Sequence, residues 1–152
     1  MDNITINYLL KNNPSTKRFF LGCFPCDRIP FTDRYPYFVV ANTDSSFQSG
    51  THWIVIYVFN AYNAEYFDSY GELPNPCIQK YLENYKYVKI NKFQIQSNFS
   101  EVCGQYCIYF SIKRSEGINF DEIIRKLKQI KEPDRFVRNH LLTWTSMQSG
   151  IC

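Results

Sequence analysis

The pattern of hydrophobic and polar positions predicts four β-strands. Three of them are YFVVANT (37–43), HWIVIYVF (52–59) and AEYFDSY (64–70), which are rich in β-branched and aromatic residues. The polar stretch NAYNA joins the second to the third as a hairpin turn. The alternating segment YVKINKFQIQ (87–96) predicts a strand with one buried face, and the proline-punctuated stretch 18–30 predicts an extended segment that passes over the core.

Helical patterns occupy most of the remaining chain, at 1–11, 75–85, 101–114, 119–130 and 133–144. Asn75, followed by Pro76, and Asn119 are suitable N-caps, and Gly117 ends the third of these helices. That third helix is apolar on most of its faces, so we expect it at the centre of the core. The fold class is therefore α+β, with a small, mainly antiparallel sheet packed by helices.

The composition, 45% hydrophobic and 18% aromatic, predicts one globular domain over residues 1–152, since no repeat or linker divides the chain. No apolar run approaches the roughly 18 residues that span a bilayer, and the first thirty residues do not look like a signal peptide. We expect a soluble, intracellular monomer without membrane association, whose six cysteines are mostly free thiols. The net charge of +3 comes from dispersed basic residues and supports nucleic-acid binding only weakly.

The chain has only two histidines, and their positions differ. His140 falls in the last amphipathic helix, where we expect a surface residue, whereas His52 opens a predicted strand after a Ser-Gly turn. Asp68 lies near the end of the next strand, so a hairpin would bring Asp68 and His52 to the same edge of the sheet. The carboxylate would then hold the Nδ1 proton of His52 and leave Nε2 as a base, although an Asp at this position can also simply cap a turn.

Cys103 and Cys107 lie four residues apart in the apolar helix, but only Cys103 falls in its first turn. The helix dipole and the free N–H groups there stabilise a thiolate, whereas Cys107 is expected to pack in the core. Gln96 is expected to close the strand that precedes this helix, and its amide with the backbone N–H of Cys103 would form an oxyanion hole. A solvated Gln at a strand end is the alternative. Gly104 would leave the backbone beside Cys103 open to a substrate.

Cys23 and Cys26 have the CxxC spacing of zinc and redox sites. Zinc would require two further ligands, and the only obvious second pair is Cys103 with Cys107. A redox motif should open a helix, but prolines follow Cys26. We therefore expect no metal site.

The ordered set His52-Trp53, Asp68, Gln96 and Cys103-Gly104 resembles the adenovirus-type maturation proteases, cysteine peptidases related in their catalytic core to the SUMO-deconjugating Ulp proteases. The segments FFLGCFPCDRIP, VVANT, GTHW, YFDSYG and QSNFSEVCGQYC also resemble that family, and together they cover about residues 19–115. Two features depart from the adenoviral pattern. Asp68 stands where those enzymes have Glu, and in this respect the chain looks more like the Ulp group. The chain is also shorter beyond the central helix.

This resemblance implies a papain-like or Ulp-like core whose buried central helix carries the nucleophile, Cys103. It implies that His52 is the general base, Asp68 the orienting acid and Gln96 the oxyanion-hole donor, and Trp53 is expected to shield the substrate cleft or to pack in the core. The implied function is a cysteine endopeptidase that cleaves precursor proteins of a DNA virus or virus-like element during virion maturation, in the virion or in the host nucleus or cytoplasm.

Three other functions stay open at this point: a Ulp-like isopeptidase that removes ubiquitin-like modifiers, a catalytically inactive binding domain of the same fold, and a nucleic-acid-binding module. The sequence requires no cofactor, and activation by DNA or a peptide is implied by the resemblance alone. Cys77 is a poor candidate for the disulfide that joins adenoviral enzymes to a peptide cofactor. We expect the terminal MQSGIC (147–152) to be a disordered end.

Overall fold

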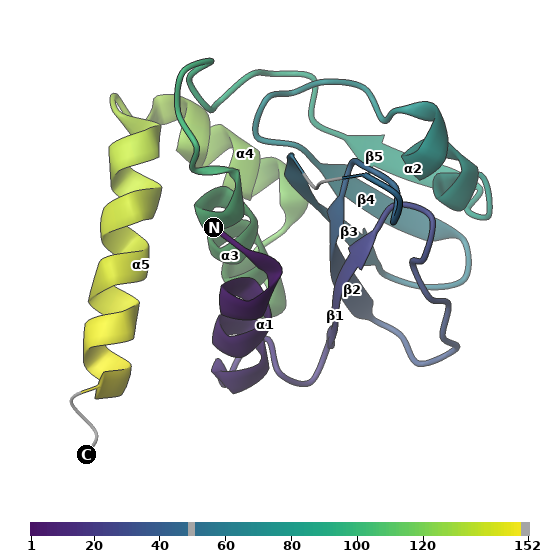
Figure 1. Ribbon diagram of the computed structural model, residues 1–152, viewed down its shortest axis with the longest axis horizontal. Coiled ribbons are helices and arrows are strands. Elements are labelled where there is room, and N and C mark those ends of the chain that lie inside the picture. The colour runs from purple at the N-terminus through teal and green to yellow at the C-terminus, as the bar shows by residue number, and fades with distance from the viewer. Residues whose placement is uncertain (49–50, 150–152) are drawn as a thin grey trace.

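A five-stranded sheet forms the centre of the protein in the computed structural model, which describes residues 1–48 and 51–149 (Figure 1). The strands lie in the order of the sequence: β1 (Phe20–Pro25), β2 (Tyr37–Asn42), β3 (Trp53–Val58), β4 (Asn63–Phe67) and β5 (Tyr87–Ile90). The three central strands are antiparallel, and β1 and β5 each add a parallel strand at an edge. The predicted α+β class, with a sheet packed by helices, is confirmed.

Five helices accompany the sheet in the described part of the chain: α1 (Asn3–Asn12), α2 (Pro76–Leu82), α3 (Cys103–Ser115), α4 (Phe120–Gln129) and α5 (Pro133–Ser149). Asn75 and Asn119 cap α2 and α4 as predicted, because their side chains accept the backbone N–H of Ile78 and Glu122. The prediction of a disordered end over residues 147–152 is wrong for residues 147–149, which continue α5. Residues 150–152 lie outside the described part of the chain.

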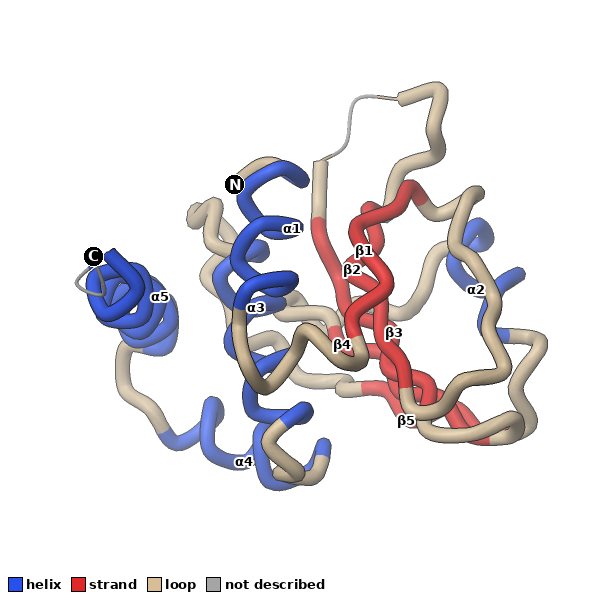
Figure 2. The backbone as a smooth tube through the Cα atoms, turned by 90° about the horizontal axis from the view of Figure 1, so that it is seen from below, coloured by secondary structure: helices blue, strands red, loops and turns tan. Residues whose placement is uncertain are grey.

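The helices cover both faces of the sheet, so each central strand buries successive side chains on opposite sides. One face packs under α1, α3 and α4, with α5 against the far side of α3, whereas α2 lies on the other face (Figure 2). The central helix α3 buries most of its length, from Gly104 to Ile112, as its apolar sequence predicted. None of the helices formed by the described residues is long and apolar enough to cross a membrane.

Two sequence predictions about strands need correction. The stretch 18–30 is more than an extended segment, since β1 lies within it and pairs with β2. The strand predicted over 87–96 ends at Ile90 and leaves most of its side chains exposed. It stops there because Asn91 turns its side-chain amide to the backbone of Asp68, so Gln96 lies in the loop that follows and does not close a strand.

Cys26 and Cys77 form a disulfide, with a Cα–Cα distance of 5.8 Å. This corrects the expectation that these two cysteines are free thiols. It also removes the zinc and redox interpretations of the CxxC spacing, because Cys23 packs against the opposite face of the sheet from Cys26. Within the described ranges, the free cysteines are Cys23, Cys103 and Cys107, and no three His, Cys, Asp or Glu residues are grouped to hold a metal ion.

Candidate active site

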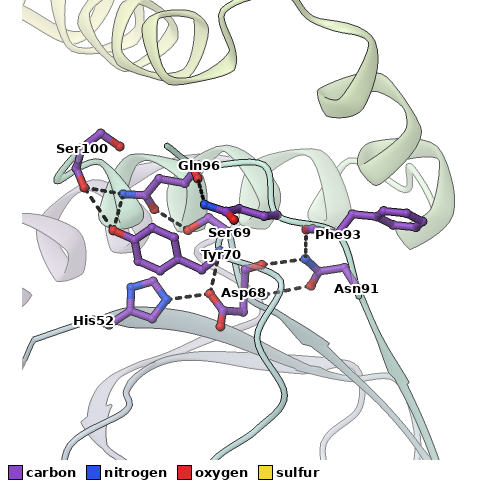
Figure 3. Close-up of polar contacts among 9 residues, drawn as sticks. His52, Asp68, Ser69, Tyr70, Asn91, Phe93, Gln96 and Ser100 are labelled. Atoms are coloured by element: carbon purple, nitrogen blue, oxygen red, sulfur yellow. Dashed lines mark hydrogen bonds and ion pairs between the residues drawn. The ribbon is translucent and has the colours of Figure 1, made fainter. Parts of the chain in front are cut away.

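The β3–β4 hairpin brings His52 and Asp68 together at one end of the sheet. His52 directly precedes β3 and Asp68 directly follows β4, and the two strands are antiparallel. The Nε2 of His52 lies 2.6 Å from Oδ1 of Asp68, as a donor to the carboxylate (Figure 3). The imidazole is therefore turned the opposite way from our expectation, which placed Nδ1 on the carboxylate. Nδ1 is the ring nitrogen left for other partners.

Asp68 is 2% exposed and is held from several directions. Its Oδ1 also accepts the backbone N–H of Tyr70 at 2.9 Å. The side chain of Asn91 accepts the Asp68 N–H at 2.9 Å and donates to the Asp68 carbonyl at 2.6 Å. A carboxylate fixed in this way restricts the orientation of the imidazole that it binds.

Cys103 is the first residue of α3, and Val102 provides no side-chain cap for this helix. Burial raises the pKa of the Cys103 thiol, but hydrogen bonding to His52 and to the backbone N–H groups of Trp53 and Gly104 lowers that pKa overall. The helix N-terminus favours a negative charge at the same place. Cys103 therefore occupies the surroundings of a reactive thiolate.

The pKa of His52 moves in the opposite direction. Burial lowers it, but the hydrogen bonds to Asp68 and Cys103 outweigh burial and raise the pKa of His52 from 6.5 to about 9. A lowered cysteine pKa beside a raised histidine pKa favours the ion pair of thiolate and imidazolium at neutral pH.

The other described free thiols and the second histidine lie in different surroundings. Burial raises the pKa of Cys107 well above its ordinary value and that of Cys23 to about 12. Cys107 is 1% exposed within the core, as predicted. His140 is half-buried on α5, where its ring meets Tyr109 edge-on with 5.0 Å between ring centroids. Neither Cys107 nor His140 has the partners that activate Cys103.

Gln96 is buried beside the pair rather than solvated at a strand end. Its Oε1 accepts the hydroxyl of Ser69 at 2.6 Å. Its Nε2 donates to the carbonyl of Ser100 at 2.9 Å and to the hydroxyl of Tyr70 at 3.3 Å (Figure 3). The two amide hydrogens thus have two protein acceptors, and the structure does not leave one of them free for an oxyanion.

The two predicted cleft residues, Trp53 and Gly104, both contact the first residue of the chain, which lies near the start of α3 (Figure 1). The indole Nε1 of Trp53 donates to the Met1 carbonyl at 3.0 Å. A Cβ added to Gly104 would lie 3.0 Å from Cβ of Met1 and 3.5 Å from Cδ1 of Ile6. The space that we expected Gly104 to keep open is therefore filled by Met1 and by Ile6 of α1.

Three polar residues that the sequence did not predict also support this site: Ser69, Tyr70 and Asn91. The ring of Tyr70 packs against the imidazole of His52 with 4.7 Å between ring centroids. Two of the three directly follow Asp68 in the sequence, which was the available signal. No sequence signal pointed to Asn91, because a polar residue at its position simply fits the alternating pattern of the predicted strand.

The comparisons with known proteins support the fold. No protein-family profile and no curated protein matches this chain. Two crystal structures of the ASFV pS273R protease match it with TM-scores of 0.54 and 0.57, at 18% and 20% sequence identity. Each match covers 90% of this chain but only 65% and 66% of the ASFV protein, so the chain spans about two thirds of that protease.

The central domain of the uncharacterized Lpg1148 protein from Legionella pneumophila has a TM-score of 0.57 at 15% identity, and the match covers 97% of this chain and 96% of that domain. At these identities the matches show a common fold. The resemblance to the adenovirus-type proteases stays a prediction. This chain shares its fold with the ASFV pS273R protease and the Lpg1148 domain, and its His52, Asp68 and Cys103 gather at one end of the central sheet.

Proposed function

We propose that this protein is a cysteine protease with Cys103 as the nucleophile, His52 as the acid and base, and Asp68 as the residue that orients His52. The opposite directions of the Cys103 and His52 pKa shifts carry the proposal, because a lowered thiol pKa beside a raised imidazole pKa favours the thiolate–imidazolium pair of a cysteine nucleophile. The 2.6 Å contact of His52 with Asp68 supports it independently of any pKa. A catalytically inactive binding domain would require neither the shifted pKa values nor the contact between His52 and Asp68.

The chemistry follows from this arrangement. The thiolate of Cys103 attacks the scissile carbonyl, and the imidazolium of His52 gives its proton to the departing amine, which leaves a thioester on the enzyme. Water then attacks the thioester while His52 accepts its proton, and the acid and the thiolate are released. The N–H groups of the first turn of α3, which no side chain caps, would stabilise the oxyanion. Gln96 joins them if it shares one of its two amide N–H groups with the oxyanion.

We propose precursor proteins of a DNA virus or virus-like element as substrates, cut after small residues during maturation. The resemblance of the motifs and the fold of the ASFV protease support this class. The third member of the triad, Asp68, instead favours the Ulp group, which makes an isopeptidase the second candidate. Electrophilic probes made from SUMO and ubiquitin, compared with capsid precursors, distinguish the two. Adding DNA or a peptide to the same assay tests for activators.

The direct test is a peptide cleavage assay with the unmodified protein, Cys103→Ala and Cys107→Ala. Loss of the nucleophile should reduce kcat by about 10³-fold or more, whereas the Cys107 variant should retain activity. Cys107 is the matched control, because it is the same residue type on the same helix. Cleavage that survives Cys103→Ala but not Cys107→Ala would show that the nucleophile is wrongly assigned.

A further inference from the structure

Tyr70 contacts three members of the candidate site, Asp68, His52 and Gln96. It lies in the turn after β4, where its backbone N–H donates to Oδ1 of Asp68. Its ring packs against the imidazole of His52 at a tilt of 33° (Figure 3). Its hydroxyl donates to the Ser100 carbonyl at 3.1 Å and accepts from Nε2 of Gln96 at 3.3 Å. One side chain thus reaches both the base and the amide.

We propose that Tyr70 is a positioning residue that holds the imidazole of His52 with its ring and the amide of Gln96 with its hydroxyl. This inference deepens the proposed function and rests on it. The two contacts have separate consequences. The ring keeps His52 aimed at Cys103, which sustains the thiolate, and the hydroxyl sets where the Gln96 amide points when an oxyanion forms.

The lengths of the Gln96 hydrogen bonds indicate which amide N–H can be shared with an oxyanion. The bond to the Ser100 carbonyl is 2.9 Å long, and the bond to the Tyr70 hydroxyl is 3.3 Å long. The longer bond is the weaker one, so its N–H is the one that Gln96 can share between the Tyr70 hydroxyl and an oxyanion, with the hydroxyl still orienting the amide. The Ser100 bond and the Ser69 bond to Oε1 then keep the amide in place.

The electrostatic surroundings keep the Tyr70 hydroxyl protonated. Burial raises the pKa of Tyr70, and the negative charges of Cys103 and nearby carboxylates raise it further. The hydroxyl therefore stays a donor to Ser100 while it accepts from Gln96. Ser100 lies three residues before Cys103, so this bond also ties the turn after β4 to the segment that leads into α3.

Two substitutions separate the two contacts. Tyr70→Phe keeps the ring and removes the hydroxyl, and we expect kcat to fall about tenfold with little change in KM, because only transition-state stabilisation is lost. Alkylation of Cys103 by iodoacetamide should stay within about twofold, since that reaction needs the thiolate but forms no oxyanion. Tyr70→Leu removes the ring as well and should slow alkylation several-fold, with a steeper dependence on pH between about pH 6 and 8.

The double variant Tyr70→Phe with Gln96→Ala tests whether the hydroxyl acts through the amide. It should cleave no more slowly than Gln96→Ala alone. Tyr81→Phe is the control, because Tyr81 also loses hydroxyl hydrogen bonds but lies on the opposite face of the sheet. It should retain kcat.

Three results would overturn the role of Tyr70: an unchanged or higher kcat in Tyr70→Phe, multiplicative losses in the double variant, or equal alkylation rates in the Phe and Leu variants. The proposed function fails in a different way. In that case the unmodified protein cleaves nothing and Cys103 is alkylated no faster than Cys107. If cleavage is absent but Cys103 still reacts fastest, the comparison of Tyr70→Leu with Tyr70→Phe still decides whether the ring holds His52.

Discussion

The first two turns of α3 hold two cysteines with opposite properties. Burial raises the pKa of both Cys103 and Cys107. At Cys103, hydrogen bonds from His52 and from two backbone N–H groups reverse that effect and lower the pKa. Cys107 lies one turn deeper in the core, where burial alone dominates. The difference indicates that the polar partners at the helix end, rather than the residue type or the helix, decide in which direction the pKa of each thiol moves.

Removing the imidazole of His52 should make the thiol pKa and the alkylation rate of Cys103 more similar to those of Cys107. In His52→Ala the thiol keeps its burial but loses its hydrogen-bond partner, so its pKa should rise and its alkylation rate at pH 7 should fall at least about tenfold. Iodoacetamide labelling followed by mass spectrometry of peptides measures this rate. His140→Ala is the matched control and should label Cys103 at the normal rate. Equal rates in the two histidine variants would contradict the role of His52.

Replacing the carboxylate should change the pH range of activity. In the proposed mechanism the imidazolium of His52 supplies the proton to the leaving amine, so cleavage should fall as the pH rises through the His52 pKa of about 9. Asp68→Asn removes the negative charge that helps to raise this pKa, while burial continues to lower it. The alkaline limb of kcat should therefore move to lower pH by about one unit or more. An alkaline limb that stays near pH 9 in Asp68→Asn would exclude Asp68 as the cause of the raised His52 pKa.

Cys107→Ala should affect stability but not reactivity. Its sulfur is buried in the core, so removing it should lower the free energy of unfolding by about 1 kcal/mol. Denaturant unfolding measures the loss, and the alkylation rate of Cys103 serves as the second readout. A stability equal to that of the unmodified protein together with slower alkylation of Cys103 would reverse the roles that we assign to the two turns.

The smallest effect is expected at Gly104. An added Cβ would meet Cβ and Sδ of Met1 at 3.0 and 3.3 Å, which a shift of Met1 by a few tenths of an ångström relieves. The better helix propensity of alanine offsets part of this cost, so Gly104→Ala should lower the free energy of unfolding by less than about 1 kcal/mol. Thermal unfolding tests this value. A loss of several kcal/mol would show that Met1 is packed rigidly over the first turn of α3.

The sequence was sufficient to predict the features of the site that depend on local pattern and simple topology. A hairpin between two alternating segments necessarily returns the chain to the end from which it started, which placed Asp68 near His52. An apolar helix that opens at a cysteine places that thiol at the helix N-terminus. The same logic separated Cys103 from Cys107, because one turn of helix is enough to move a residue into the core.

The features that the sequence did not predict depend on contacts between distant segments. The orientation of the His52 ring is set by where Asp68 and Cys103 lie in space, not by their order. The disulfide forms because β1 adds to the edge of the sheet and brings Cys26 to the start of α2. The contact of Met1 with Trp53 joins residues that are 52 positions apart. No periodicity in the sequence encodes such distances.

The central claim is that Cys103 is an activated nucleophile. Its most direct test is to compare the alkylation rates of Cys103, Cys107 and Cys23 in the folded, unmodified protein at pH 7. The account predicts that iodoacetamide labels Cys103 at least about tenfold faster than Cys107 and Cys23, and that the rates become similar after unfolding. The unfolded sample controls for intrinsic differences between the peptides. If Cys107 or Cys23 is labelled as fast as Cys103 in the folded protein, the assignment of Cys103 as an activated nucleophile is wrong.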